Sequence, residues 1–450
     1  DMKYCTRCVY PANHPLNLTF DDQGVCSGCR VHEEKDLLDW GERGAKLGQI
    51  FDQFRARSRA AYDCIVPVSG ARDSYFIVHV VKNIFKMHPL LVSYNKQYNT
   101  GTGIRNLAYL QSIFGCDLIT CTVSPDKVKR VTKESLRKCG SIYWHCLAGS
   151  TVFPVRTAVD LKVPLIVWGV HQGCDQVGMF SHLDEVEMTR KYRKEHDLMG
   201  IEAEDLVNDG DGLAIEEMQP YLYPHDKELE SVGIRGIYLS NYLRWDSKAQ
   251  HELMIDHFDY ETIPQQRTFD TYNDVDCVHY SGLHDYIKFL KLGYGKVTDH
   301  ASREIRLKRM TREEGVALVE KYEPVQPADI VQFCDWLNID KRELFEHVDL
   351  VRDSRIWSRS ETGAWEQRDS VTNHVDDAGV NDVLLSCRSD CEFRLTPPRE
   401  TTQDVSDGYA HIGRACVDTG YLPQVVQKFP VELTAADAIS NELLHEMRSA

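Results

Sequence analysis

Four cysteines near the N-terminus have the spacing of a metal site. Cys5 and Cys8 form one Cys-x2-Cys pair, and Cys26 and Cys29 form a second pair after 17 intervening residues. Each such turn directs two sulfurs at one metal ion, and four thiolates fill the tetrahedral shell of zinc. A filled shell leaves no position for a substrate, so the pattern predicts a structural Zn²⁺ ion. The alternative interpretation is four cysteines that only pack.

A second chemical motif is the sequence VSGARDS at residues 68–74. It follows a short apolar run and precedes a helical pattern, which predicts a strand, a tight loop and a helix. Such a loop directs backbone N–H groups and a helix N-terminus at an anion. Ser69 and Ser74 would add hydroxyl donors. Arg72 would offset phosphate charge, and Asp73 would cap the helix or hold Mg²⁺. A purely structural turn is the alternative.

The elements that must position this loop follow a strand–helix alternation. Strands are expected at residues 64–68, 89–95, 116–123 and 163–170, and helices at 33–60, 103–114, 125–139 and 181–206. This alternation predicts an α/β fold with a parallel sheet and right-handed crossovers. In such a sheet the ligand lies at the carboxyl ends of the strands, where the loop falls. Further on, helices interrupted at Gly293 and Gly295 are expected.

The loop resembles the SGGxDS pyrophosphate loop of the ATP pyrophosphatase (PP-loop) superfamily, whose fold is adenine nucleotide alpha hydrolase-like. The resemblance implies ATP and Mg²⁺ as cofactors, with Ser69, Gly70, Ala71, Arg72, Asp73, Ser74, Asn99 and Gly169 on the nucleotide side. The motif's second glycine is Ala71 here. A positive φ at that position would cost Ala about 1 kcal/mol.

A longer resemblance points to one branch of that superfamily, the N-acetyl sugar amidotransferases of O-antigen and flagellar-sugar pathways. It covers about residues 2–325 and includes the sequences KYCTRCVYPANHPLNLTFDDQGVCSGC, VWGVHQGCDQVGMFSHLDEVEMTRKYRKEHDLMG and SGLHDYIKFLKLGYGKVTDHASREIR. The family implies that an acetamido group of a nucleotide-linked diacetamido sugar becomes an acetamidino group. ATP would adenylate the amide oxygen, and ammonia would then displace AMP. The implied ammonia source is a separate glutaminase with a cyclase-like, ammonia-channelling partner.

The candidate catalytic and substrate residues lie in the loop and in later segments. Arg72, Asp73, Ser74 and His171 are the candidate catalytic residues, and Gln172, Met179, Arg190, Arg193 and Lys296 are the candidate substrate contacts. His171 and Gln172 follow the fourth expected strand, where an imidazole could orient the amide or move a proton. Either arginine could pair with the diphosphate of the sugar nucleotide. The alternatives are an ordinary loop for His171 and helix-surface ion pairs for the cations.

The composition disfavours two functional classes, nucleic-acid-binding proteins and membrane-spanning proteins. The chain has 450 residues and a formal net charge of −17, which disfavours general nucleic-acid binding because that depends on neutralising phosphates. Apolar runs are too short for a membrane span, and the N-terminus has no signal-peptide core. We therefore expect a cytoplasmic protein that binds neither nucleic acid nor membrane.

The sequence pattern divides the chain into four parts: a zinc knuckle at 1–35, the ATP-binding α/β domain at 36–260, a helical substrate-side region at 261–355 and an appended acidic segment at 356–450. Two other functions stay open. One is a PP-loop tRNA sulfur transferase, since those enzymes also carry zinc motifs. The other is a non-catalytic scaffold, because Ala71 departs from the motif.

Overall fold

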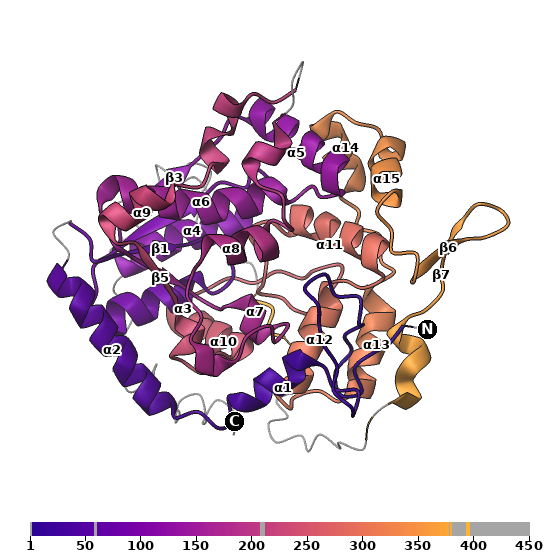
Figure 1. Ribbon diagram of the computed structural model, residues 1–450, viewed down its shortest axis with the longest axis horizontal. Helices are drawn as coiled ribbons and strands as arrows, with labels where there is room; N and C mark the ends of the chain where they lie inside the picture. Colours follow the sequence, from indigo (N-terminus) through magenta and orange to yellow (C-terminus); the bar gives the residue numbers. More distant parts are fainter. Residues whose placement is uncertain (1, 58–60, 208–211, 378, 380–392, 397–450) are drawn as a thin grey trace.

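A five-stranded parallel sheet forms the centre of the computed structural model, which describes residues 2–57, 61–207, 212–377, 379 and 393–396 (Figure 1). The strand order is β3-β2-β1-β4-β5. The strands are β1 (Cys64–Pro67), β2 (Pro89–Tyr94), β3 (Leu118–Cys121), β4 (Leu165–Trp168) and β5 (Arg235–Tyr238). The α/β class and the four expected strands are confirmed, whereas β5 was missed. The order reverses between β1 and β4, and ligands of open parallel sheets bind at this kind of switch point.

Helices cover both faces of the sheet, so the strands are apolar on both sides. On one face, Ile65 and Ile166 pack under α6 (Trp144–Leu161). On the other face, Val66 and Val167 join a large apolar cluster. That cluster is completed by α2 (Trp40–Arg57), α3 (Ser74–Val78), the π-helical turn η1 (His79–Ile84), α4 (Gly101–Phe114) and α10 (Ser247–Phe258). The alternation of side chains along each strand sets which residue meets which helix.

Helix ends follow local capping chemistry where the sequence provides it. The helix expected at 125–139 is α5 (Pro125–Cys139). The Ser124 hydroxyl accepts a hydrogen bond from the Lys127 N–H at its start, and Gly140 adopts a left-handed φ of 60° at its end. Thr100 caps α4 in the same way by accepting from the Gly103 N–H. These ends are predictable because they depend on neighbouring residues alone.

Two helix expectations were wrong. The helix expected at 33–60 is interrupted, because α1 (Ser27–Glu34) ends before α2 begins at Trp40. The carbonyl oxygen of Lys35 accepts from the Trp40 indole and from the Arg244 guanidinium, so tertiary contacts hold the interruption. Residues 181–206 form only short turns: η2 (His182–Asp184), α8 (Arg190–Tyr192), η3 (Arg193–Asp197) and η4 (Ala203–Leu206). Their charges pair with other segments, as Glu187 does with Arg235.

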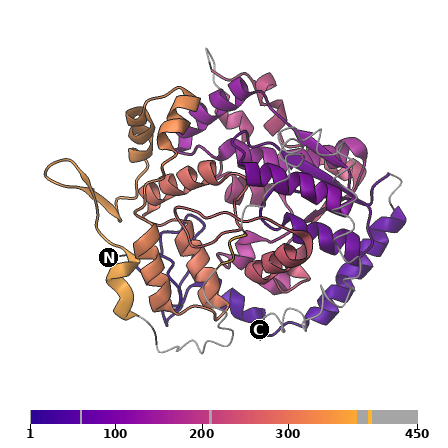
Figure 2. The same cartoon turned by 180° about the vertical axis from the view of Figure 1, so that it is seen from behind.

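A helical body packs beside the sheet and carries the N-terminal segment (Figures 1 and 2). It comprises α11 (Val278–Leu292), α12 (Lys296–Arg306), α13 (Arg312–Tyr322), α14 (Ile330–Leu337) and α15 (Lys341–Asp349). As expected, the helices break at Gly293, which has a φ of 78°, and restart after Gly295. Beyond them lie the projecting hairpin of β6 (Trp357–Arg359) and β7 (Trp365–Gln367), and η7 (Val371–Asp377).

The remaining elements lie between β4 and β5 or directly after β5. They are α7 (Gln172–Asp175), η5 (Ile215–Tyr221), α9 (Asp226–Val232) and η6 (Leu239–Asn241). In the described part of the chain, no helix combines the length and apolar character needed to cross a bilayer. Most of the acidic segment expected at 356–450 falls outside the described residues, and the four domain boundaries stay predictions.

Candidate functional site

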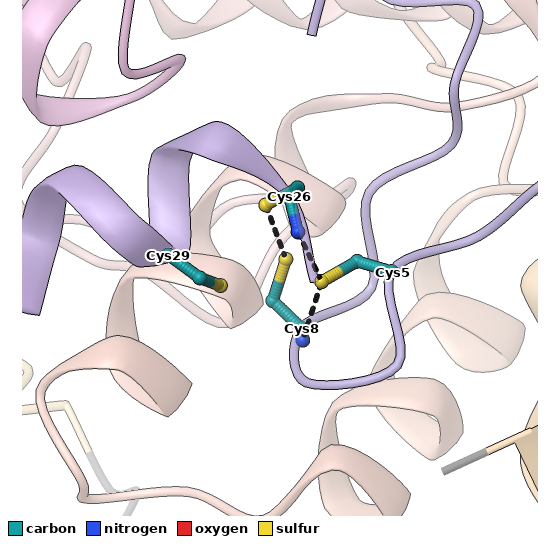
Figure 3. A group of neighbouring side chains, drawn as sticks. All are labelled: Cys5, Cys8, Cys26 and Cys29. Atoms are coloured by element: carbon teal, nitrogen blue, oxygen red, sulfur yellow. Dashed lines mark hydrogen bonds between the residues drawn. The ribbon is translucent and has the colours of Figure 1, made fainter. Parts of the chain in front are cut away.

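The four N-terminal cysteines meet in one buried cluster (Figure 3). Their sulfurs all lie within 4.8 Å of one another, and the Cys8 and Cys26 sulfurs are 3.6 Å apart. Sulfurs at about 2.3 Å from a tetrahedral Zn²⁺ would lie about 3.8 Å from each other. The cluster therefore fits a structural zinc ion, as the spacing predicted. Cys26 and Cys29 come from the start of α1, and Cys5 and Cys8 come from the preceding loop (Figure 3).

Two arginines dock this cysteine cluster onto the helical body. The Arg306 guanidinium of α12 donates to the Cys26 sulfur at 3.5 Å and to the carbonyl oxygen of Gln176 at 2.7 Å. The Arg312 guanidinium donates to the carbonyl oxygens of Cys5 and Cys8. Arg306 thereby joins the cysteine cluster to the loop after β4. Its positive charge also offsets the negative charge of thiolates.

The loop after β1 is held by its own hydroxyl groups. The Ser74 hydroxyl accepts from the Ser69 N–H at 2.9 Å and donates to the Ala71 carbonyl oxygen at 3.0 Å. The Ser69 hydroxyl also bonds to the backbone of Ala71. A Cβ added to Gly70 would lie 1.9 Å from the carbonyl oxygen of Gly103 at the start of α4. The loop and α4 are therefore in contact at a position that accepts only glycine.

The left-handed residue of the loop is Arg72, with a φ of 54°. Ala71 is fully buried and is not among the residues with positive φ. The backbone cost considered for Ala71 therefore does not apply. An arginine in the left-handed region is uncommon, and such strain often marks functional sites.

Charged side chains from three segments gather beside this loop. The Arg72 guanidinium lies 3.6 Å from an oxygen of Asp274, whose other oxygen lies 3.4 Å from the Lys296 ammonium. The Lys96 ammonium, which follows β2, donates to Asp276 at 2.8 Å. Burial raises the pKa of Asp274, but the charges of Lys296 and Arg72 outweigh it and set that pKa below its usual range. The structure thus assembles three cations and two carboxylates around residues 69–74.

Three of these five charged residues were missed in the sequence. Lys96 comes two residues after β2, and Asp274 and Asp276 lie in an irregular segment before α11. The available signal was weak. Lys96 follows a strand at the expected ligand edge, but nothing local connects Asp274 or Asp276 to that edge. The connection is tertiary: the Thr100 N–H donates to the carbonyl oxygen of Asp276.

Asp73 precedes α3 but does not cap it with its side chain. One of its carboxylate oxygens is buried and has no hydrogen-bond partner among the described residues. Burial raises the pKa of this carboxyl, against the nearby charges of His251 and Arg72. Of the two roles expected for Asp73, capping α3 with its side chain is wrong, and holding Mg²⁺ stays a prediction.

His171 lies in an aromatic enclosure after β4. Its ring centroid is 4.2 Å from that of Tyr192 and 4.6 Å from that of Tyr238. Neither ring nitrogen has a hydrogen-bond partner among the described residues, and burial lowers the pKa of the imidazole to about 4. A neutral, fully buried imidazole in this position packs as an aromatic group, and its expected role in catalysis stays a prediction.

The other substrate-side candidates do not gather around the loop. Arg193 is buried and pairs with Glu202 at 2.9 Å, and Arg190 lies 3.8 Å from Asp226. Met179 is exposed, and Gln172 and Gly169 are half-buried at the end of β4. Asn99 is exposed, and its amide donates to Asn95. Among the predicted substrate contacts, Lys296 alone is brought to the loop, through Asp274.

Fold and site together define a mixed α/β protein with a charged loop at the switch point of its sheet and a buried cysteine cluster suited to zinc. Residues 266–371 match the family model described as "LPS biosynthesis protein WbpG-like, C-terminal domain". The matched segment contains Asp274, Asp276 and Lys296. The match relates this segment of the chain to proteins of lipopolysaccharide biosynthesis. A search of the curated proteins finds no match.

Proposed function

We propose that the protein is an ATP-dependent N-acetyl sugar amidotransferase of surface-polysaccharide biosynthesis. It would convert an acetamido group of a nucleotide-linked diacetamido sugar into an acetamidino group. The observation that carries the proposal is the loop at residues 69–74, which lies at the switch point of the sheet with Arg72, Lys96 and Lys296 beside it. The match of residues 266–371 to a lipopolysaccharide-biosynthesis domain supports the substrate class.

The proposed reaction has two steps. The amide oxygen attacks the α-phosphorus of ATP, and pyrophosphate leaves. Ammonia then adds to the activated carbon, and AMP leaves with the oxygen. In this scheme the three cations stabilise the phosphate charge that builds up as pyrophosphate departs. Asp73 would hold Mg²⁺ at the phosphates, because a carboxylate oxygen without a protein partner is a suitable ligand.

The ammonia source is part of the proposal. We expect a partner glutaminase with a cyclase-like subunit to deliver ammonia directly. In that case glutamine supports product formation only when the partner is present, whereas free ammonium supports it without the partner. Equal rates with glutamine and with ammonium in the isolated protein would remove the need for any partner.

To test the proposal, the full chain is incubated with ATP, Mg²⁺, ammonium and a UDP-linked diacetamido hexose. AMP and pyrophosphate are quantified, and the sugar is analysed by mass spectrometry for exchange of one oxygen for an NH group. Sugar-dependent AMP release with this exchange is the expected result. AMP release that depends on tRNA would favour the sulfur transferase, and absence of ATP binding would favour the scaffold. Ala71→Gly in parallel tests whether the loop methyl limits turnover.

A further inference from the structure

One carboxylate stands between two cations that come from opposite sides of the candidate site. Asp274 contacts Arg72 of the loop after β1 at 3.6 Å and Lys296 at the start of α12 at 3.4 Å. The Asp274 side chain is 18% exposed, whereas Arg72 is 52% exposed, so the pair is open to solvent on the loop side. Lys296 also donates to Gln265 at 3.1 Å. The lysine is therefore held in place whether or not Asp274 is present.

Both residues of the Arg72–Asp274 contact have a left-handed backbone conformation. Arg72 has a φ of 54° and Asp274 a φ of 56°, so both residues adopt the left-handed conformation. Aspartate tolerates this region, but arginine rarely adopts it. The strained conformation of Arg72 indicates that the surrounding structure, and not local preference, brings the two residues together.

The segment that carries Asp274 is fixed to the same elements as the loop. The Thr100 hydroxyl and N–H, at the start of α4, donate to the carbonyl oxygens of Val275 and Asp276. A Cβ added to Gly103 would lie 2.3 Å from the Asp276 Cα, and Gly103 is also the residue that contacts the loop at Gly70. The carboxylate of Asp274 thus occupies a fixed anionic position beside a loop suited to anions.

We propose that Asp274 is a displaceable stand-in for a phosphate group of the nucleotide. In the ligand-free protein it neutralises Arg72 and Lys296. An incoming polyphosphate takes over both cations, and the released carboxylate then faces a divalent cation that arrives with the phosphates. This inference rests on the phosphate-binding part of the proposed function. Because the ion pairs must be exchanged, a phosphate without its metal binds weakly and the metal complex binds well.

The experiment is isothermal titration of the full chain with inorganic pyrophosphate, first without added divalent cations and then with Mg²⁺. Asp274→Asn and Asp274→Gly both remove the charge, and both residues accept a positive φ, so the backbone is retained. Asp52→Asn is the matched control, because Asp52 is an exposed aspartate that pairs with Arg55 on α2. Thermal unfolding of each variant checks that it folds.

Without Mg²⁺, both Asp274 variants are expected to bind pyrophosphate about tenfold more tightly than the wild type, and Asp52→Asn is expected to match the wild type. Addition of Mg²⁺ should strengthen binding more in the wild type than in the Asp274 variants. Unchanged or weaker binding in folded Asp274 variants, with measurable binding in the wild type, overturns this inference alone.

Absence of pyrophosphate binding in every protein, with and without Mg²⁺, overturns both this inference and the assignment of the loop to phosphate. The expected binding pattern without sugar-dependent AMP release would instead leave the inference standing and refute the proposed amidotransferase. The two proposals are therefore separated by one binding measurement and one turnover measurement.

Discussion

Glu323 is a buried carboxyl whose ionisation should oppose folding. It is 4% exposed and accepts hydrogen bonds from the Gly295 N–H and the Thr298 hydroxyl at the start of α12. Burial raises its pKa from 4.5 to about 7, although both hydrogen bonds and the Arg267 charge act in the other direction. The folded state therefore holds this proton more tightly than the unfolded state does.

The direction in which pH changes the stability follows from the difference between the folded and unfolded pKa of Glu323. The contribution of Glu323 to stability is fully present below its unfolded pKa near 4.5 and is lost as the pH rises through about 7. A shift of this size corresponds to about 3 kcal/mol. Glu323→Gln keeps an oxygen that can accept both hydrogen bonds but cannot ionise. Relative to wild type, this variant should gain about 3 kcal/mol of unfolding free energy between pH 4.5 and pH 8.

The assay is equilibrium urea denaturation followed by tryptophan fluorescence, with wild type and Glu323→Gln compared at each pH. The comparison cancels the titration of all other groups that the two proteins share. A difference that does not change with pH would show that Glu323 titrates normally. A difference that grows in favour of wild type would show that Arg267 stabilises the carboxylate, and either result would refute the reasoning.

Four further predictions follow from contacts described above. Cys26→Ser should abolish bound metal, which elemental analysis of wild type should find at one ion per chain, and should lower Tm by at least ~5 °C. Gly70→Ala should abolish ATP binding in titration calorimetry, because its Cβ would meet the Gly103 carbonyl oxygen at 1.9 Å; unchanged affinity would show that α4 can move. Arg306→Lys should retain the metal but cost about 1–3 kcal/mol in urea denaturation, since an ammonium cannot satisfy Cys26 and Gln176 in the same geometry. Lys96→Met should lower the free energy of unfolding by about 3–5 kcal/mol, because it leaves the buried Asp276 charge without its partner. Adding Asp276→Asn should recover part of that loss. Additive losses in the double variant would contradict the pairing.

The features that the sequence predicted correctly depend on short stretches of chain. The cysteine cluster followed from the spacing of Cys5, Cys8, Cys26 and Cys29, because each turn needs only its own residues. The strand–loop–helix at 64–78 followed from an apolar run and a Ser/Gly turn. The strand order could not be read in the same way, and β5 was missed because its four residues, RGIY, contain too little apolar sequence to stand out.

The parts that escaped prediction depend on contacts between distant segments. Residues 181–206 have a helix-forming composition, yet Glu187 pairs with Arg235 of β5, and this tertiary contact favours turns over one continuous helix. Asp274 lies about 200 residues after the loop it contacts, so no local pattern could place it there. The assignment of ATP, the sugar and the glutaminase to this chain depends on resemblance, and these remain proposals.

The docking of the cysteine cluster has a consequence for the order in which the chain matures. The cluster needs only residues 5–29 to bind a metal, but it is covered by Arg306 and Arg312, and Arg312 lies 307 residues after Cys5. At 5–20 residues per second, a ribosome takes ~15–60 s to make that stretch. Metal capture can therefore take place on the nascent chain, while the cover forms only after most of the protein has been synthesised. During that interval the two arginines do not yet cover the cysteines, so a metal ion bound early would protect the thiolates from oxidants.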